Sequence, residues 1–245
     1  TIDELIRHAV SKMSHIHFVA NERAKKRLVQ LGELEKSIFV IGSPDLDLMN
    51  PSKLPSLDVA KNYYGVEFDE YAIAMFHPIT TEYENIYNYA KNFCQALVDS
   101  NKNYILIYPN NDLGSNEIIH EYQSLVTNPK IKIYPSLRFE YFLILLKNSN
   151  FIIGNSSAGV REAPFYNVPV VDIGTRQNNR VTSDLIVNCD YSSEAILSAM
   201  SAILNCSDRT NENEVDEFGS GNSDLKFKKI LDSEAIWKTN CQKQF

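Results

Sequence analysis

The sequence predicts an α/β fold built on a doubly wound parallel sheet, with helices covering both faces. Between about residues 66 and 208, short apolar segments alternate with segments whose apolar residues recur at helical spacing. The short segments are continuously apolar, which is typical of strands buried on both faces of a parallel sheet. Ligands of such sheets bind beyond the carboxyl ends of the strands, so functional residues are expected in the loops that follow those ends.

Five strands alternate with five helices in this part of the chain. The expected strands are the apolar segments at residues 71–76, 104–108, 131–134, 151–153 and 168–173. The expected helices have apolar residues three or four positions apart, at residues 86–97, 118–125, 139–146, 160–166 and 194–204. A shorter series of helix, strand, helix and strand precedes them, at residues 5–13, 15–20, 24–31 and 37–41.

Four parts are expected along the chain. Residues 1–44 form the first part, in which the chain enters a helix at once and has no initiator methionine. Residues 45–65 contain prolines and are expected to connect two lobes. Residues 66–208 form the main, ligand-binding lobe, and residues 209–245 form a polar loop and a C-terminal helix. These features predict a chain cut from a longer protein.

The composition argues against several classes of partner. The 24 Lys and Arg residues and 31 Asp and Glu residues give a formal charge of −7, and no basic run indicates nucleic acid. The four cysteines form no C-x-x-C pair, which disfavours a disulfide framework or zinc site and favours the reducing cytoplasm. No apolar run approaches the ~20 residues of a membrane helix. No clustered Asp, Glu and His set suggests a metal, so neither a metal nor another cofactor is expected.

A small polar turn follows the expected strand at 151–153, and a helix is expected directly after it. The free N–H groups and the positive dipole end of a helix start form an anion site. Ser156 and Ser157 offer hydroxyl groups to phosphate oxygens, and Gly159 lets the backbone approach a ligand. Glu162, about one turn into the helix, is suited to a ribose diol. The alternative is that Ser157 only caps the helix and Glu162 is solvated.

Three further loops follow expected strand ends. His77 comes directly after the first strand of the main lobe, where an imidazole can bind a diphosphate or move a proton, although a lone histidine is more often structural. Asn110 follows the second strand, in a loop whose Asn and Asp residues are also ordinary turn formers. Arg176 follows the last expected strand and can pair with phosphate or remain solvated.

A weaker candidate lies before the last helix. Gly221 and Asn222 belong to a second glycine-containing helix start, which alone is a weak signal of anion binding. The four strand-end loops, taken together, place small, polar or cationic groups where they can converge in one crevice. This set suits a nucleotide diphosphate bound without a metal. The chain has no G-x-G-x-x-G run in these loops, which argues against a nicotinamide cofactor.

The same loops carry a series of motifs in a defined order. They are TIDELIRHA at 1–9, GSPD at 42–45, FHPITT at 76–81, YPNND at 108–112, GNSSAGVRE at 154–162 and GTRQ at 174–177. With these motifs the chain resembles UDP-N-acetylglucosamine 2-epimerases over nearly its whole length. The resemblance implies the C-terminal Rossmann-like lobe of a two-lobed, GT-B-like epimerase fold, in which residues 1–44 are the end of an otherwise missing N-terminal lobe.

The resemblance also implies roles for individual residues. His77 is the candidate catalytic residue, beside the diphosphate. The candidate substrate-binding residues hold the diphosphate, ribose or uracil, or line the cleft: Asn110, Leu137, Phe142, Ser156, Ser157, Gly159, Glu162, Arg176, Gly221 and Asn222. Ser220 stands where many relatives have Asp, which puts the role of its neighbours in doubt. The family's acid and base groups belong to the N-terminal lobe, most of which is expected to be missing here.

The residues after His77 separate two branches of this family. Non-hydrolysing members typically have arginines there, whereas this chain has Ile79, Thr80 and Thr81 and so resembles the hydrolysing branch. That branch makes N-acetylmannosamine and UDP for sialic acid synthesis, by eliminating UDP to a glycal and hydrating it with inversion at C2. The implied ligands are UDP-N-acetylglucosamine, or a related UDP-sugar, and UDP. The full-length protein is expected to be a homo-oligomer, a dimer or tetramer, without nucleic-acid or membrane partners.

Four alternatives remain open. They are a non-hydrolysing epimerase, a hydrolysing epimerase of UDP-diacetylbacillosamine for legionaminic acid, a non-catalytic UDP-binding module, and a glycosyltransferase lobe. The HPITT and GTRQ motifs together disfavour the last of these. Without its other lobe, the chain is expected to bind UDP weakly and not to turn over substrate.

Overall fold

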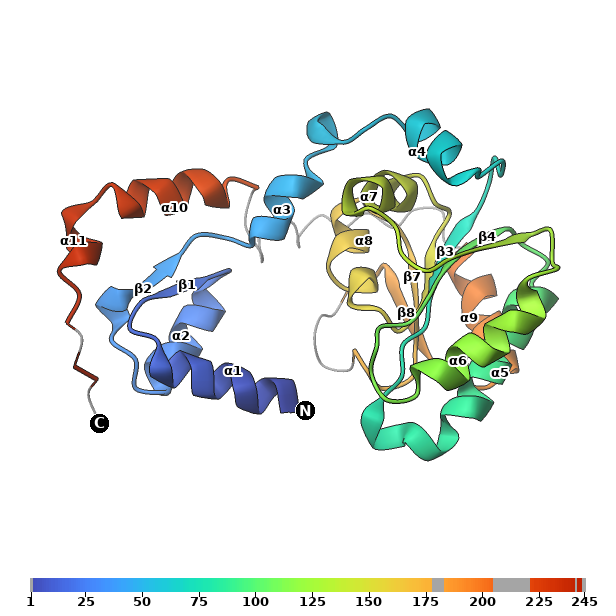
Figure 1. Cartoon of the computed structure of the whole chain (residues 1–245), viewed down its shortest axis with the longest axis horizontal. Coiled ribbons are helices and arrows are strands. Elements are labelled where there is room, and N and C mark those ends of the chain that lie inside the picture. The colour runs from blue at the N-terminus through green and yellow to red at the C-terminus, as the bar shows by residue number, and fades with distance from the viewer. Residues whose placement is uncertain (1, 178–182, 205–220, 241, 244–245) are drawn as a thin grey trace. The chain divides into compact units, whose positions relative to one another are not determined.

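The chain forms two compact units (Figure 1). One joins residues 1–53 to residues 215–245, and the other comprises residues 54–214. The computed structural model describes residues 2–177, 183–204, 221–240 and 242–243. No helix within these residues combines the length and the apolar character needed to cross a bilayer.

The larger unit is built on a six-stranded parallel sheet. In chain order its strands are β3 (Ala72–Met75), β4 (Tyr104–Ile107), β5 (Ile131–Tyr134), β6 (Ile152–Gly154), β7 (Val170–Ile173) and β8 (Ile186–Cys189). The spatial order β5-β4-β3-β6-β7-β8 places the first strand in the middle, and the chain winds outward from it in both directions. The topological switch point, where ligands bind in such sheets, therefore lies between β3 and β6. The predicted doubly wound α/β fold is confirmed.

Helices cover both faces of this sheet (Figure 1). They are α4 (Leu57–Tyr64), α5 (Ile86–Asp99), α6 (Ser115–Tyr122), α7 (Phe139–Lys147), α8 (Glu162–Phe165) and α9 (Ser193–Leu204), with 3₁₀ turns η3 (Thr80–Asn85), η4 (Gln123–Leu125) and η5 (Ser157–Gly159). On one face, α5 packs between α6 and α9, and its buried stripe of Ile86, Ala90, Phe93 and Leu97 follows the predicted helical spacing. On the other face, α7 contacts α4, α8 and β3.

The smaller unit contains a two-stranded parallel sheet. Its strands are β1 (His17–Val19) and β2 (Ile38–Val40); its helices are α1 (Ile2–Met13), α2 (Glu22–Gln30), α3 (Pro44–Met49), α10 (Ser223–Leu231) and α11 (Glu234–Trp237), with 3₁₀ turns η1 (Glu35–Ser37) and η2 (Pro51–Lys53). The helix α10 packs against α3, although the two are far apart in the sequence. The helix α1 leaves several large apolar side chains exposed, namely Leu5, Ile6, Val10 and Met13.

A buried carboxylate joins three segments of the smaller unit. Glu33 is 6% exposed and lies 3.1 Å from both Lys12 Nζ and His17 Nε2. Lys243, near the end of the chain, donates a third hydrogen bond to it. Burial acts to raise the pKa of Glu33, but the hydrogen bonds from Lys243, Lys12 and His17 outweigh it and lower the pKa to about 2.

Three elements differ from the sequence prediction. The strand β8 is not predicted, because it is a half-exposed edge strand without the continuous burial of the others. The range 45–65, predicted as a connection, contains most of α3 and all of α4. The helix predicted at 160–166 is instead the 3₁₀ turn η5 followed by the four-residue α8. Pro164 has no N–H to donate to Val160, so it interrupts a helix that would continue through both.

Gly154 lets the strands at the switch point lie side by side. It stands opposite Met75 in the pairing of β6 with β3 and has a φ of +133°. A Cβ atom there would lie 1.9 Å from the carbonyl oxygen of Met75, well inside contact distance. Only glycine fits both the backbone conformation and the close approach.

We predict that Gly154→Ala is strongly destabilising, because the added methyl group would force β3 and β6 apart. We expect a loss of roughly 3 kcal/mol or more in the free energy of unfolding, measured by urea denaturation. Gly65→Ala is the matched control: Gly65 also has a positive φ, of +63°, but no atom lies within 4 Å of its Cβ position. It should cost only about 1–2 kcal/mol. Equal losses in the two variants would contradict the packing argument.

Candidate functional site

The ends of β3 and β6 place His77 and Asn155 side by side at the switch point. His77 is two residues beyond the end of β3, and Asn155 directly follows β6. His77 is 8% exposed and Asn155 is fully buried. The structure therefore brings the predicted catalytic histidine to the place in the sheet where a ligand crevice is expected.

The side chain of Asn155 fixes the backbone of His77. Its Oδ1 accepts a hydrogen bond from the His77 N–H at 2.7 Å, and its Nδ2 donates to the His77 carbonyl at 2.8 Å. Both polar ends of the amide are thus used on one residue. Asn155 lies within the predicted polar turn, but its role is not predicted, because its partner is 78 residues away in the sequence.

The imidazole of His77 is held as a neutral donor. Its Nδ1 accepts a hydrogen bond from the backbone N–H of Asn110 at 3.0 Å, so in the neutral ring the proton is on Nε2. Burial lowers the pKa of His77 to about 4; the charge of Arg176 acts in the same direction and that of Asp112 opposes it. At neutral pH the ring can donate one hydrogen bond from Nε2 without carrying a charge.

The loop after β7 brings Arg176 to the same place. Arg176 Nη1 donates to the carbonyl oxygen of Asn155 at 3.1 Å, and Gln177 Nε2 donates to the same oxygen at 2.8 Å. Asn155 therefore connects the loops that follow β3, β6 and β7. The guanidinium group supplies a permanent positive charge near His77, which suits an anionic ligand. Gln177, which is 3% exposed, is not among the predicted site residues.

Asn110 joins the cluster through its backbone more than through its side chain. Its N–H binds the His77 ring, and its Nδ2 donates to the carboxylate of Asp112. Its Oδ1 is buried and makes no hydrogen bond within the described chain. That acceptor can take a hydrogen bond from a hydroxyl or amide group of a ligand, but not from an unprotonated phosphate.

The turn after β6 offers fewer free donors than the sequence predicts. Ser156, not Ser157, is the capping residue, and its Oγ accepts from Ala158 N at 3.3 Å. The N–H groups of residues 159–161 donate to the carbonyl groups of Ser156 and Ser157. Because the following helix has only four residues, it contributes little of the expected dipole. The Ser156 and Ser157 hydroxyl groups remain the main candidates for binding an anion here.

The other predicted residues of this unit lie in neighbouring elements. Glu162 is 8% exposed at the start of α8, and Gly159 is buried in η5. Phe142 is 7% exposed on α7, which packs against α8. Leu137 is half-buried in the loop between β5 and α7. The side chains of Leu137 and Phe142 are apolar and can contact a base only by packing, so their assignment to a uracil site remains a prediction.

The predicted anion site at the start of α10 already contains a carboxylate. Gly221 and Asn222 precede this helix in the smaller unit. Asp47 Oδ1 accepts from Ser223 N at 2.9 Å, and its Oδ2 accepts from Asp224 N at 2.9 Å and Ser223 Oγ at 2.6 Å. Burial acts to raise the pKa of Asp47, but these hydrogen bonds lower it. The sequence predicts free N–H groups at this helix start, but in the structure those of Ser223 and Asp224 are bound to Asp47.

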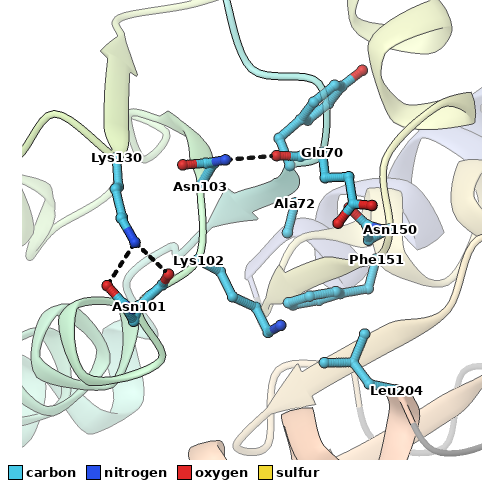
Figure 2. Close-up of a pocket in the computed structure, with 10 residues that line it drawn as sticks. Glu70, Ala72, Asn101, Lys102, Asn103, Lys130, Asn150, Phe151 and Leu204 are labelled. Carbon is cyan, nitrogen blue, oxygen red and sulfur yellow. Dashed lines mark hydrogen bonds between the residues drawn. The ribbon is translucent and has the colours of Figure 1, made fainter.

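A polar pocket lies at the amino ends of the strands, on the side of the sheet opposite to the His77 cluster. Figure 2 shows it at the amino ends of the strands, between Lys102, Asn150 and Leu204. Lys130, on its wall, binds the carbonyl oxygen and Oδ1 of Asn101 at 3.0 and 2.7 Å. Because ligands of doubly wound sheets bind at the carboxyl ends, this pocket is not the predicted crevice. In the described residues, no group of three His, Cys, Asp or Glu side chains could hold a metal ion.

Comparison with known proteins identifies relatives along the whole chain. The family model for UDP-N-acetylglucosamine 2-epimerase matches residues 1–232. A UDP-N-acetylglucosamine 2-epimerase of Neisseria meningitidis is 47% identical over 251 residues, covering 100% of this chain and 65% of the relative. A UDP-N,N'-diacetylbacillosamine 2-epimerase (hydrolyzing) of Legionella pneumophila is 37% identical over 206 residues, covering 84% of this chain and 55% of the relative.

A solved structure with the same fold supports the match. It is the Methanocaldococcus jannaschii UDP-GlcNAc 2-epimerase in complex with UDP-GlcNAc and UDP, with a TM-score of 0.66 and 23% identity. The likeness covers 89% of this chain and 61% of that one. The chain thus spans less than two thirds of the length of each of these three proteins.

We predict that the buried histidine makes the stability of the protein depend on pH. The pKa of His77 is about 4 when folded and 6.5 at its ordinary value, so between these limits the unfolded chain binds a proton that the folded chain does not. This contribution to stability is present above pH 6.5 and is lost as the pH falls towards 4. Between pH 7 and pH 5 the loss should be about 2 kcal/mol.

His77→Asn should lack this part of the pH dependence, while its amide oxygen can still accept from Asn110 N–H. Urea unfolding followed by circular dichroism at pH 7 and pH 5 measures the difference. His120→Asn is the matched control, because it makes the same substitution at an exposed imidazole on α6 and leaves His77 in place. The prediction is wrong if His77→Asn loses as much stability as the parent on acidification.

Proposed function

The chain belongs to the UDP-N-acetylglucosamine 2-epimerase family, and from this premise we propose that it is the UDP-binding part of a hydrolysing epimerase. The substrate would be UDP-N-acetylglucosamine and the products N-acetylmannosamine and UDP, for sialic acid synthesis. In the relatives, about a third or more of the length lies outside the region that this chain matches. We propose that turnover needs residues from that region as well.

The observation that carries the proposal is the cluster of His77, Asn155 and Arg176 at the switch point. It places a neutral imidazole donor and a guanidinium group within one hydrogen-bonded network. A nucleoside diphosphate carries negative charge on its phosphate oxygens, and these oxygens accept hydrogen bonds from such donors. The M. jannaschii structure with this fold contains UDP-GlcNAc and UDP, which supports a uridine nucleotide as the ligand class.

The proposed chemistry begins with the loss of UDP. A base removes the proton from C2 of the sugar, the bond from C1 to the diphosphate oxygen breaks, and a glycal and UDP result. Negative charge grows on the departing diphosphate, and preorganised donors lower the free energy of that transition state. His77 Nε2–H and the Arg176 guanidinium are the donors that this chain supplies. Water then adds its oxygen to C1 of the glycal. A proton adds to C2 on the face opposite to the one from which the first proton was removed, and this inverts C2.

Two observations favour hydrolysis over retention of the UDP-sugar. Ile79, Thr80 and Thr81 follow the His77-Pro78 pair, where non-hydrolysing members of the family typically have arginines. The L. pneumophila relative, at 37% identity, is described as hydrolysing. That relative acts on UDP-N,N'-diacetylbacillosamine, so this substrate is the second candidate.

The proposal is tested by product analysis with the complete protein. Incubation with UDP-N-acetylglucosamine should release UDP and free N-acetylmannosamine in equal amounts, measured by a coupled assay for UDP and by NMR of the sugar. UDP-N-acetylmannosamine without free UDP would identify a non-hydrolysing enzyme. UDP-diacetylbacillosamine, assayed in parallel, distinguishes the second substrate.

The 245-residue chain alone should bind UDP in calorimetry but release none from the UDP-sugar. Arg176→Ala should weaken UDP binding about tenfold or more, since a charge-assisted contact to phosphate is worth roughly 1.5–3 kcal/mol. Robust turnover by the chain alone would show that the unmatched region of the relatives is not needed. If Arg176→Ala leaves the UDP affinity unchanged, the cluster of His77, Asn155 and Arg176 is not the UDP site.

A further inference from the structure

A second set of hydrogen bonds connects the strand-end loops beside His77. Glu82, in η3, accepts hydrogen bonds from the hydroxyl groups of Thr175 and Tyr191. The Tyr191 contact is 2.8 Å long, and Tyr191 also accepts from the backbone N–H of Thr175 at 3.3 Å. These three residues follow β3, β7 and β8, so one carboxylate joins three loops at the carboxyl edge of the sheet. Thr175 lies within the GTRQ motif, but the sequence predicts no role for any of the three residues.

Tyr191 is itself rigidly placed. Its ring stacks on Tyr89 of α5 with centroids 3.6 Å apart, and it meets the edge of Phe76, the residue before His77. Gly174 lies directly against it: a Cβ at Gly174 would be 2.0 Å from Tyr191 Cζ, and φ there is +77°. The start of the loop after β7 is therefore packed against a fixed aromatic ring.

The same loop carries the cation of the candidate site. Thr175 is bound to Glu82, and the next residue, Arg176, donates to the carbonyl oxygen of Asn155. Arg176 is half-buried and has a long flexible side chain, whose ordering costs conformational entropy. Anchoring the backbone one residue before it reduces the conformations that the guanidinium group can reach.

We propose that Glu82 is a positioning residue for Arg176, which through its two hydroxyl partners fixes the loop at 174–177 so that the guanidinium group faces the diphosphate. This inference rests on the proposed function. Glu82 does not touch the ligand in this scheme. Its negative charge would by itself repel a diphosphate, so its benefit must come from the geometry that it imposes.

The charge of Glu82 and its positioning of Arg176 have opposite effects on UDP affinity. The direction in which the affinity changes in Glu82 variants therefore tests the proposal. Glu82→Ala removes both the charge and the anchor, and should weaken UDP binding to the chain about tenfold in calorimetry. Glu82→Gln removes the charge but can still bond both hydroxyl groups, and should bind UDP at least as tightly as the parent. Thr175→Val removes one hydroxyl group without changing the charge, and should weaken binding. Tighter binding by Glu82→Ala would overturn the proposal.

A double-mutant cycle separates positioning from a general loss of structure. In an Arg176→Ala background, Glu82→Ala should have little further effect on UDP affinity, because the group that it positions is gone. Full additivity of the two changes would overturn the proposal. Circular dichroism and thermal unfolding of each variant establish that the fold is retained.

NMR titration of the His77 ring tests the same inference without any nucleotide. Displacing the Arg176 charge should raise the pKa of His77, whereas the loss of the Glu82 charge alone would lower it. A raised pKa in Glu82→Ala but not in Glu82→Gln supports the proposal, and a lowered pKa in both overturns it. If the parent chain binds no UDP, the proposed function fails, and this titration still decides the role of Glu82.

Discussion

The amide of Asn155 makes two hydrogen bonds to the backbone of His77, across the point where the sheet changes its direction of winding. The backbone carbonyl oxygen of Asn155 accepts hydrogen bonds from the side chains of Arg176 and Gln177. A fully buried amide with all these partners is costly to disturb, because each group left unpaired would lose about 1–3 kcal/mol. The positions of the histidine and the arginine follow from this one residue, and the glycine before it allows the strands to approach closely enough for the bonds to form.

Burial and the neighbouring cation combine to keep the His77 ring neutral. In a site that receives a diphosphate, a neutral donor has a distinct use: it stabilises charge that develops during departure without holding the charged product as an ion pair would. The permanent charge is supplied instead by Arg176, because a guanidinium group stays protonated in proteins. In the proposed reaction, Arg176 would attract the anion, and His77 would stabilise the charge that develops as the anion departs.

The sequence predicts most of the fold, and the reason is the uniform burial of the central strands. The segment at 71–76 is continuously apolar because β3 is covered on both faces, whereas β8 is half-exposed and leaves no such pattern. Part of the candidate site is predictable in the same way. His77 and Arg176 are found at strand ends, which topology makes predictable. The hydrogen bonds of Asn155 and Glu82 join residues 78 and 93 positions apart, and no local pattern encodes them. The helix predicted at 160–166 is shorter in the structure, because the apolar spacing does not show the effect of Pro164 on the backbone hydrogen bonds.

Asp47 determines whether the start of α10 can bind an external anion. Its carboxylate holds the N–H groups at the start of α10 and is covalently tethered, so its effective concentration there is far above that of any free metabolite. A phosphate arriving at that helix would have to displace an internal competitor and leave it buried without its three donors. The N–H groups at the start of α10 are therefore paired within the protein itself, and Asp47 serves to join α3 to α10.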